Sequence, residues 1–351
     1  MPSSRKKAPV RPATTPWGAR TALIIAGVLV ALVLGEMMVR ILVPEPARPR
    51  VTEPAGFSPF TRTSKGVRVY VPGVSFSHIY DITADPRSYF GAAGRVDYRI
   101  NNLGFRGEDI TVEKPRAIRR VLCLGDSFTF GEGVREKDAW PQRLGQILGA
   151  QTQVINAGIQ GADLDSEALF LLLYGRQLTP DVVVIAFFMN DAMPFEETVA
   201  HQSLLEAPIS ASKLGRYSAI WRFLVRRRMA ASQTRRYLSD LHQSFASQHW
   251  RDARARIPRL RAMADHDGFR IVAAIFPLLY SLDGDYPLER EHVEVRTAFA
   301  DAGIEVVDLL ETYRGHDAAE LWAHVTDPHP NEIAQAMAAE RIARAIGSAK
   351  P

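Results

Sequence analysis

The sequence predicts an α/β domain with a parallel sheet between two layers of helices, preceded by one membrane-spanning helix. Two observations lead to this prediction. From Arg120 onward, short runs rich in Val, Ile and Leu alternate with segments typical of helices, which indicates a three-layer α/β/α domain. Near the amino terminus, residues 21–39 form an apolar run long enough to cross a bilayer.

The first 20 residues form a basic tail. They contain no acid and five basic residues, Arg5, Lys6, Lys7, Arg11 and Arg20, whereas the whole chain has a formal charge of +4. The remainder is therefore about neutral (+4 − 5 = −1). A nucleic-acid partner requires a basic domain rather than a basic tail, so we expect no nucleic-acid binding.

Residues 21–39 are predicted to be a signal anchor. Their only charged residue is Glu36, and a helix of this length just spans the bilayer core. Because the basic residues come first, the positive-inside rule places the amino terminus in the cytoplasm and the chain after about residue 40 outside it. A cleaved signal peptide and a buried core helix are the alternatives. The length of the run and the lack of a small-x-small cleavage site favour an uncleaved anchor.

Two short regions follow the anchor. Residues 40–60 are rich in proline and charge, as in an extended stalk. Residues 61–118 contain β-like runs at 67–71 and 96–100 and a turn-rich stretch at 101–107. We expect a small β-rich lead-in packed on the main domain. The alternative is that the lead-in contributes to the substrate site through Arg106.

The main domain is predicted to span residues 119–347. Strands are expected at 120–124, 153–156, 181–188, 270–276 and 304–307, because parallel strands buried on both faces are continuously apolar. Helices are expected from about Asp138 with Pro141 in the first turn, at 164–178, 250–265 and 288–302, and after Asn331 as N-cap. Cys123, the only cysteine, is expected to be buried in the first strand.

An insertion of about residues 195–250 interrupts this alternation. Its segment from 216 to 238 holds seven arginines and no acid, with apolar residues at helical spacing. Three interpretations remain open: a solvated helix docked by its apolar stripe, a basic amphipathic helix on an anionic membrane surface, and a cradle for an anionic polysaccharide.

Residues Gly125-Asp126-Ser127 follow the first strand. The serine hydroxyl is therefore expected at the carboxyl end of this strand, where ligands bind in open α/β sheets. A serine becomes a useful nucleophile only when a base takes its proton, and histidine oriented by a carboxylate is the usual base. Asp327 and His329 lie between the last strand and the last helix, on a loop that the flanking prolines stiffen. We expect Ser127, His329 and Asp327 to form a catalytic triad.

Two further loops offer hydrogen-bond donors for an oxyanion. Residues 156–161, Asn-Ala-Gly-Ile-Gln-Gly, follow the second strand, and Asn190-Asp191 follows the third. Glycine lets a backbone N–H approach a ligand closely, and an asparagine amide supplies another donor.

These four blocks resemble the SGNH (GDSL-type) hydrolase superfamily over about residues 95–346, and in particular its membrane-anchored bacterial members. The resemblance implies a flavodoxin-like α/β/α sandwich. It assigns Ser127 as nucleophile and oxyanion N–H, Gly161 (with Gly158 as the competing choice) and Asn190 as further oxyanion donors, and His329 with Asp327 as base and acid. The chain departs from the family in two places: Phe188-Met189 replaces the usual glycine before Asn190, and Asp-x-His replaces Asp-x-x-His.

The resemblance further implies a serine esterase in the bacterial inner membrane with a periplasmic or extracytoplasmic catalytic domain. Its expected substrates are acyl esters such as the O-acetyl groups of cell-surface or exported polysaccharide. An O-acyltransferase with the same residues is the first alternative, because water exclusion decides between the two. An anchored, non-catalytic glycan-binding or assembly factor is the second. No Cys or His cluster has metal-ligand spacing, so neither a metal nor another cofactor is expected.

Overall fold

The computed structural model describes residues 17–43, 47–52, 58–194 and 217–347, with the side chains of residues 230 and 231 left out. The described chain falls into two units. One contains the amino-terminal helix α1 (Trp17–Leu42) and residues 217–231. The other contains residues 47–194 and 232–347 and holds the predicted α/β domain.

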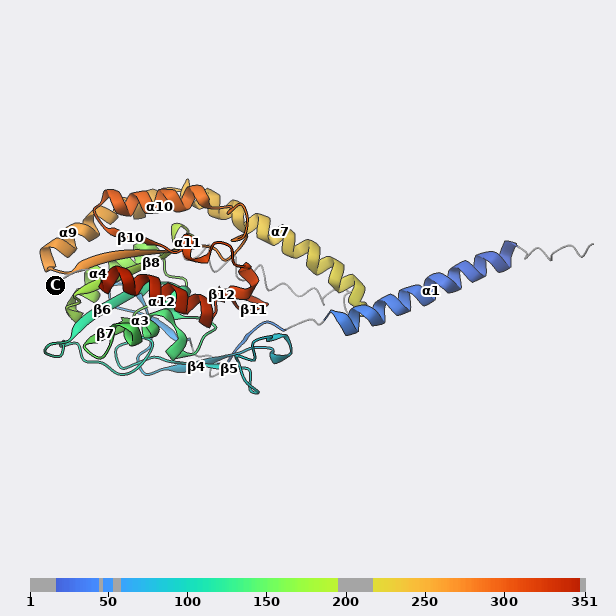
Figure 1. Ribbon diagram of the computed structural model, residues 1–351, viewed down its shortest axis with the longest axis horizontal. Helices are drawn as coiled ribbons and strands as arrows, with labels where there is room; N and C mark the ends of the chain where they lie inside the picture. Colours follow the sequence, from blue (N-terminus) through green and yellow to red (C-terminus); the bar gives the residue numbers. More distant parts are fainter. Residues whose placement is uncertain (1–16, 44–46, 53–57, 195–216, 348–351) are drawn as a thin grey trace, which may run out of the picture. The chain divides into compact units, whose positions relative to one another are not determined.

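A five-stranded parallel sheet lies at the centre of the second unit (Figure 1). Its strands are β6 (Arg119–Gly125), β7 (Thr152–Asn156), β8 (Val182–Phe188), β9 (Arg270–Phe276) and β10 (Glu305–Asp308). They agree with the predicted strands to within one residue at each end. Every residue of β8 is buried, as expected of a central parallel strand.

The strand order is β10-β9-β8-β6-β7, so the chain leaves β6 for one neighbour and later returns to the other side of β6. This is the flavodoxin-like doubly wound order, and it confirms the predicted fold. The direction of winding reverses between β6 and β8, and ligands bind at such a switch point, outside the carboxyl ends of the strands.

Helices cover both faces of the sheet. α3 (Trp140–Leu148) and α12 (Glu332–Gly347) pack together on one face. Right-handed crossovers place α4 (Leu164–Leu173), α8 (Gln248–Arg254), α9 (Ile257–Asp267) and α10 (Glu289–Asp301) on the other. The short elements are α2 (Ser127–Phe130), α11 (Leu310–Tyr313), η1 (Ile82–Ala84), η2 (Glu136–Asp138), η3 (Gly175–Leu178), η4 (Met189–Ala192) and η6 (Ala318–Leu321).

The helix boundaries follow local chemistry. Asn331 caps α12 as predicted, since its Oδ1 accepts the N–H groups of Ile333 and Ala334 at 3.0 Å each. The single helix predicted at 250–265 is wrong, because the structure has α8 and α9 there. Pro258, in the first turn of α9, cannot donate a hydrogen bond to the preceding turn, so a new helix begins.

The lead-in forms two small antiparallel sheets. One is the hairpin of β2 (Phe60–Arg62) and β3 (Arg68–Tyr70), and the other pairs β1 (Arg50–Thr52), β4 (Ser75–Ile79) and β5 (Arg95–Arg99) in the order β1-β4-β5. Within the predicted stalk, residues 50–52 form β1, which pairs antiparallel with β4. A second core of buried residues lies between the lead-in and α2: Tyr70, Phe76, Tyr80, Phe90, Val96, Tyr98, Ile100 and Phe130.

In the first unit, α1 is apolar and long enough to cross a membrane, and no part of its apolar window is buried in the structure. The predicted insertion contains α7 (Ala219–Phe245), whereas its residues 195–216 lie outside the described residues. Cys123 is fully buried in β6, as predicted.

Candidate active site

Ser127 begins the short helix α2 directly after β6. Gly125 turns the chain there with a φ of +151°, and a Cβ at this position would lie 2.1 Å from Thr129 Oγ1. Only glycine fits this close approach. Asp126 then caps α2, since its Oδ1 accepts the Phe128 N–H at 2.8 Å. The turn therefore fixes the Ser127 hydroxyl at the carboxyl end of β6.

His329 lies against this hydroxyl. Its Nε2 is 2.9 Å from Ser127 Oγ, and its Nδ1 is 2.5 Å from Asp327 Oδ1. The structure thus brings together the three residues of the predicted triad in the order that a serine nucleophile requires. Both Ser127 and Asp327 are buried, with 6% and 7% of their surface exposed.

The expectation that Asp327 and His329 lie on a loop is wrong. They belong to β12 (Asp327–Pro330), which pairs antiparallel with β11 (Trp322–His324). Successive side chains of a strand point to opposite faces, so residues two apart point the same way. The extended backbone explains how the shortened Asp-x-His block still places the carboxylate beside the imidazole.

Tyr80 supports Asp327 from the lead-in, and sequence reasoning missed it. The Tyr80 hydroxyl donates to Asp327 Oδ2 at 2.8 Å, and its ring stacks on Phe90 at 4.1 Å. The two residues of the hydrogen bond are 247 positions apart, so no local motif indicates the pair. The available signal was weak: Tyr80 directly follows β4, and Phe76 and Tyr98 are buried aromatic residues of β4 and β5.

Arg106 is structural rather than a substrate residue, contrary to the alternative considered above. Its guanidinium is buried and donates to the carbonyls of Phe130 and Gly131 at 2.6 Å each and of Val134 at 2.7 Å. These carbonyls belong to the segment that follows Ser127. The lead-in therefore holds the serine turn in place through Arg106.

The two glycines proposed for the oxyanion site have different surroundings. The Gly158 N–H donates to Asn156 Oδ1 at 3.1 Å, and a Cβ on Gly158 would lie 2.3 Å from the Phe130 nitrogen. Gly158 therefore serves close packing against α2. Gly161 has a φ of +74° and lines a cavity of about 330 Å³ that Gly125 also lines, which favours Gly161 over Gly158 as the donor.

Asn190 lies in η4, directly after β8, at the switch point of the sheet. Phe188, of the Phe188-Met189 pair that replaces the usual glycine, stacks on Phe128 with 3.9 Å between ring centroids. Asp191 Oδ2 accepts the Phe188 N–H at 2.8 Å and closes the turn. Aromatic packing and this hydrogen bond thus hold the Asn190 turn without a glycine.

A model of the GDSL-like lipase/acylhydrolase family matches residues 123–337, which is more than half of the chain. The chain belongs to this family. The resemblance to the SGNH superfamily is therefore confirmed, and the protein is a serine hydrolase of ester bonds. The comparison with curated proteins found no match.

Several solved structures match this chain at low sequence identity. A member of the lipolytic protein G-D-S-L family from Veillonella parvula DSM 2008 is 13% identical over 66% of this chain and 100% of its own, with a TM-score of 0.37. The acetyl xylan esterase AlAXEase is 16% identical over 65% and 99%, with a TM-score of 0.40. The aryl esterase of M. smegmatis is 15% identical over 66% and 99%, with a TM-score of 0.37. At these identities and TM-scores, the matches identify neither catalytic residues nor a substrate of this chain.

A second carboxylate of this hydrolase lies at the reactive nitrogen of His329, and it too was missed. Glu132 Oε2 is 3.6 Å from His329 Nε2 and accepts the Gln160 amide N–H at 2.7 Å. Burial lowers the pKa of His329, but the Glu132 and Asp327 carboxylates outweigh burial and raise this pKa to about 10. The imidazolium must lose its proton before it can act as a base.

Asp327 shows the converse effect. Burial raises the pKa of its carboxyl, but the adjacent His329 and the Tyr80 hydroxyl lower it by more, so the pKa lies well below its usual range. Asp327 is therefore ionised whenever the site is folded at neutral pH, as the partner of an imidazolium must be.

Three carboxyl groups lie beneath the serine turn, on Asp126, Glu167 and Asp191. Burial raises the pKa of Asp126 to about 6, and burial together with the neighbouring carboxylates raises the pKa values of Glu167 and Asp191 well above their usual range. Neither Glu167 oxygen has a hydrogen-bond partner among the described residues. At neutral pH the raised pKa values favour the protonated form of Glu167 and Asp191, whereas Asp126 is mostly ionised.

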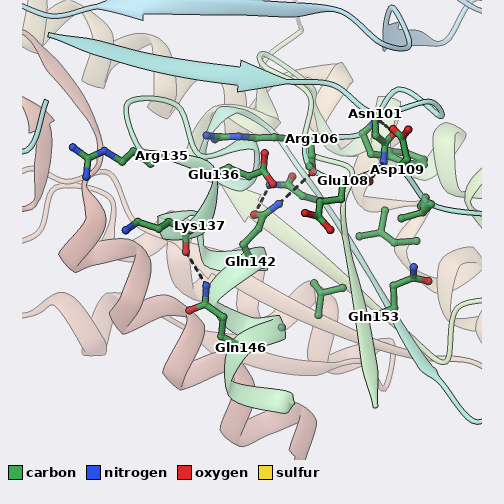
Figure 2. A pocket seen from close by; sticks show the side chains of 17 residues that line it. Asn101, Arg106, Glu108, Asp109, Arg135, Glu136, Lys137, Gln142, Gln146 and Gln153 are labelled. Atoms are coloured by element: carbon green, nitrogen blue, oxygen red, sulfur yellow. Dashed lines mark hydrogen bonds between the residues drawn. The ribbon is translucent and has the colours of Figure 1, made fainter. Parts of the chain in front are cut away.

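A larger hollow of about 650 Å³ lies elsewhere, between residues 101–110 and α3. Figure 2 shows its polar lining, in which Gln146 donates to the Lys137 carbonyl at 3.2 Å. Ser127, His329 and Gly161 do not line it. Of the proposed site residues, Gly161 lines the smaller cavity, together with Gly125 of the serine turn.

Proposed function

We propose that Ser127, His329 and Asp327 are the catalytic triad of this hydrolase. The observation that carries the proposal is the continuous line of contacts from Ser127 Oγ through the His329 ring to Asp327 Oδ1, at 2.9 and 2.5 Å. Nδ1–H donates to the carboxylate in the reactive tautomer, which leaves Nε2 free to accept the serine proton.

In the proposed reaction, the Ser127 hydroxyl gives its proton to His329 Nε2 while its oxygen forms a bond to the ester carbonyl carbon. The resulting imidazolium donates that proton to the departing alkoxide as the ester C–O bond breaks, leaving an acyl-serine. Water then adds to the acyl carbon while His329 Nε2 takes its proton. The imidazolium returns that proton to Ser127 Oγ as the acyl C–Oγ bond breaks, which releases the acid and restores Ser127. Asp327 stabilises the imidazolium in both halves.

The oxyanion would accept hydrogen bonds from the backbone N–H groups of Ser127 and Gly161 and from the Asn190 amide. Gly161 lines the cavity beside the serine turn, and Asn190 follows the adjacent strand β8. Donors fixed in place before the reaction stabilise the developing charge without reorganisation.

The substrate that we propose is a short-chain ester of a carbohydrate, with the O-acetyl group of a polysaccharide as the leading candidate. Ser127 and Asn190 are only 6% and 8% exposed, which suits a short acyl group. At the edge of the site, the Glu132 carboxylate and the Gln160 amide offer acceptors and donors that complement sugar hydroxyls.

We further propose that α1 anchors the hydrolase in a bacterial inner membrane, with the amino terminus in the cytoplasm and the catalytic unit in the periplasm. The apolar helix and the preceding basic residues support this orientation.

Acetate release from acetylated polysaccharide, compared with release from esters of increasing acyl length, tests the substrate. We expect kcat/KM to fall steeply beyond short acyl chains. Equal or higher kcat/KM on long-chain esters would contradict the proposal. Transfer of the acetyl group to an added glycan, in preference to water, would instead favour the acyltransferase.

A further inference from the structure

One sequence feature lies outside the triad and the proposed oxyanion site: the arginine-rich start of α7, with the two residues before it. Residues 217–228 hold four arginines and no acid. Within them, Tyr217, Trp221 and Leu224 expose 71%, 42% and 50% of their surface. Trp221, Leu224 and Arg228 recur at helical spacing and therefore lie along one side of the helix. Exposed aromatic and aliphatic side chains among arginines are typical of helices at a membrane surface.

Glu36 of α1 binds the beginning of this segment. Its carboxylate accepts the Ala219 N–H at 2.6 Å, the Ile220 N–H at 3.1 Å and the Ser218 hydroxyl at 3.0 Å. These are the free N–H groups at the start of a helix, where negative charge is stabilising. The only charged residue of the predicted span is thus used to hold α7.

Two neighbours of Glu36 complete the contact. Arg40, one turn later, donates to the Tyr217 carbonyl at 2.7 Å and to Glu36 Oε1 at 2.9 Å. Gly35 has no side chain, and a Cβ there would lie 3.4 Å from Ile220 Cδ1. Figure 1 shows the end of α1 meeting the start of α7. We call Gly35, Glu36 and Arg40 with residues 217–220 the clamp.

The clamp lies near the outer end of the predicted span. Glu36 precedes the end of α1 at Leu42 by six residues, or about 9 Å of helix. A bilayer core of about 30 Å takes up roughly 20 residues of the helix, so Glu36 comes close to the boundary between acyl chains and headgroups. A carboxylate at that depth is tolerated only with satisfied hydrogen bonds, which α7 provides.

We propose that residues 217–228 lie in the headgroup layer of the membrane that α1 spans, on anionic phospholipid. Trp221 and Leu224 enter the boundary of the acyl chains, and Arg227 and Arg228 bind lipid phosphates. This inference rests on the proposed anchoring of α1. The clamp sets the depth of the segment, and the charge of the arginines complements an anionic leaflet.

The test uses the full chain in nanodiscs of phosphatidylcholine with phosphatidylglycerol. In a Cys123→Ala background, a nitroxide is attached after Leu29→Cys, Leu224→Cys or Asp265→Cys. The native side chains at these three positions are 57%, 50% and 58% exposed, so the structure alone predicts similar accessibility. Collisions with oxygen and with a nickel chelate then report whether the surroundings are lipid or water.

We expect the oxygen-to-nickel collision ratio at 224 to approach that at 29, the lipid reference, and to exceed that at 265, the water reference. The double variant Arg227→Gln, Arg228→Gln should lower the equilibrium constant for binding of residues 217–228 to the headgroup layer by about thirtyfold. Arg259→Gln with Arg290→Gln, on exposed residues of the catalytic unit, is the charge-matched control and should leave the ratio unchanged.

Carbonate extraction and aryl acetate hydrolysis are measured on the same samples. A water-like ratio at 224 in an anchored, active protein overturns the inference and leaves the hydrolase intact. Extraction by carbonate overturns the anchor and the inference together. A label at 224 that responds only to added anionic polysaccharide also overturns it, in favour of a glycan surface.

Discussion

Replacing Glu132 by Gln should shift the pH dependence of hydrolysis to lower pH. Glu132 Oε2 lies 3.6 Å from His329 Nε2 and raises the pKa of that imidazole. The base works only when neutral, so kcat/KM is low below this pKa and rises as the pH passes through it. Glutamine keeps the shape and the hydrogen-bonding capacity of Glu132 but removes its charge.

The size of the shift follows from the distance. Two unit charges 3.6 Å apart interact by about 5 kcal/mol at an effective dielectric constant of about 20 and by about 1 kcal/mol in bulk water. Glu132 is partly exposed, so its effect lies between these limits, which correspond to about one to three pH units. We therefore expect the acid limb of the kcat/KM profile to move down by that amount.

The assay is hydrolysis of a small neutral aryl acetate across the pH range, so that substrate charge does not contribute. Glu340→Gln, on an exposed position of α12, controls for a general change of charge. At neutral pH the Glu132→Gln enzyme should hydrolyse this ester faster than the native enzyme, because more of its His329 is neutral. An unchanged acid limb, or one that moves to higher pH, would refute the electrostatic role of Glu132.

Three further substitutions test the surroundings of the triad. Asp327→Asn should lower kcat by roughly 10⁴-fold through loss of the correct imidazole tautomer, measured as steady-state hydrolysis with folding checked by circular dichroism. Tyr80→Phe removes one hydrogen bond to the charged Asp327 and should lower kcat by about 10- to 100-fold with KM unchanged; a change in KM alone would contradict this role. Glu167→Gln tests the buried carboxyl. Because the folded state raises the pKa of Glu167, the native protein loses stability as the pH rises above the pKa of about 4.3 that this group has in the unfolded chain. In urea unfolding, the stability of the variant relative to the native protein should therefore increase by up to about 1.4 kcal/mol per pH unit.

The sheet and its reactive edge were predictable because their signals are local. Continuous apolar runs mark β6 to β10, and the Gly125 turn follows from three adjacent residues. Since the carboxyl ends of parallel strands meet at one edge, Ser127 and Asn190 could be placed near each other before the topology was known.

The support of the triad was not predictable, because it depends on contacts between distant segments. Tyr80 reaches Asp327 from the lead-in, and Glu132 reaches His329 across the serine turn. The strand geometry of Asp327 and His329 also escaped prediction, because two prolines in four residues are typical of a loop. The pairing of β12 with β11 keeps this segment extended, so the side chains of Asp327 and His329, which one residue separates, point to the same face.

Labelling with a fluorophosphonate tests the central claim most directly. The probe phosphonylates an activated serine, and mass spectrometry identifies the modified residue. We predict one adduct on Ser127, lost in Ser127→Ala and strongly slowed in the Asp327→Asn variant. An adduct on another serine, or aryl acetate hydrolysis that survives in Ser127→Ala, would contradict the assignment of Ser127 as the nucleophile.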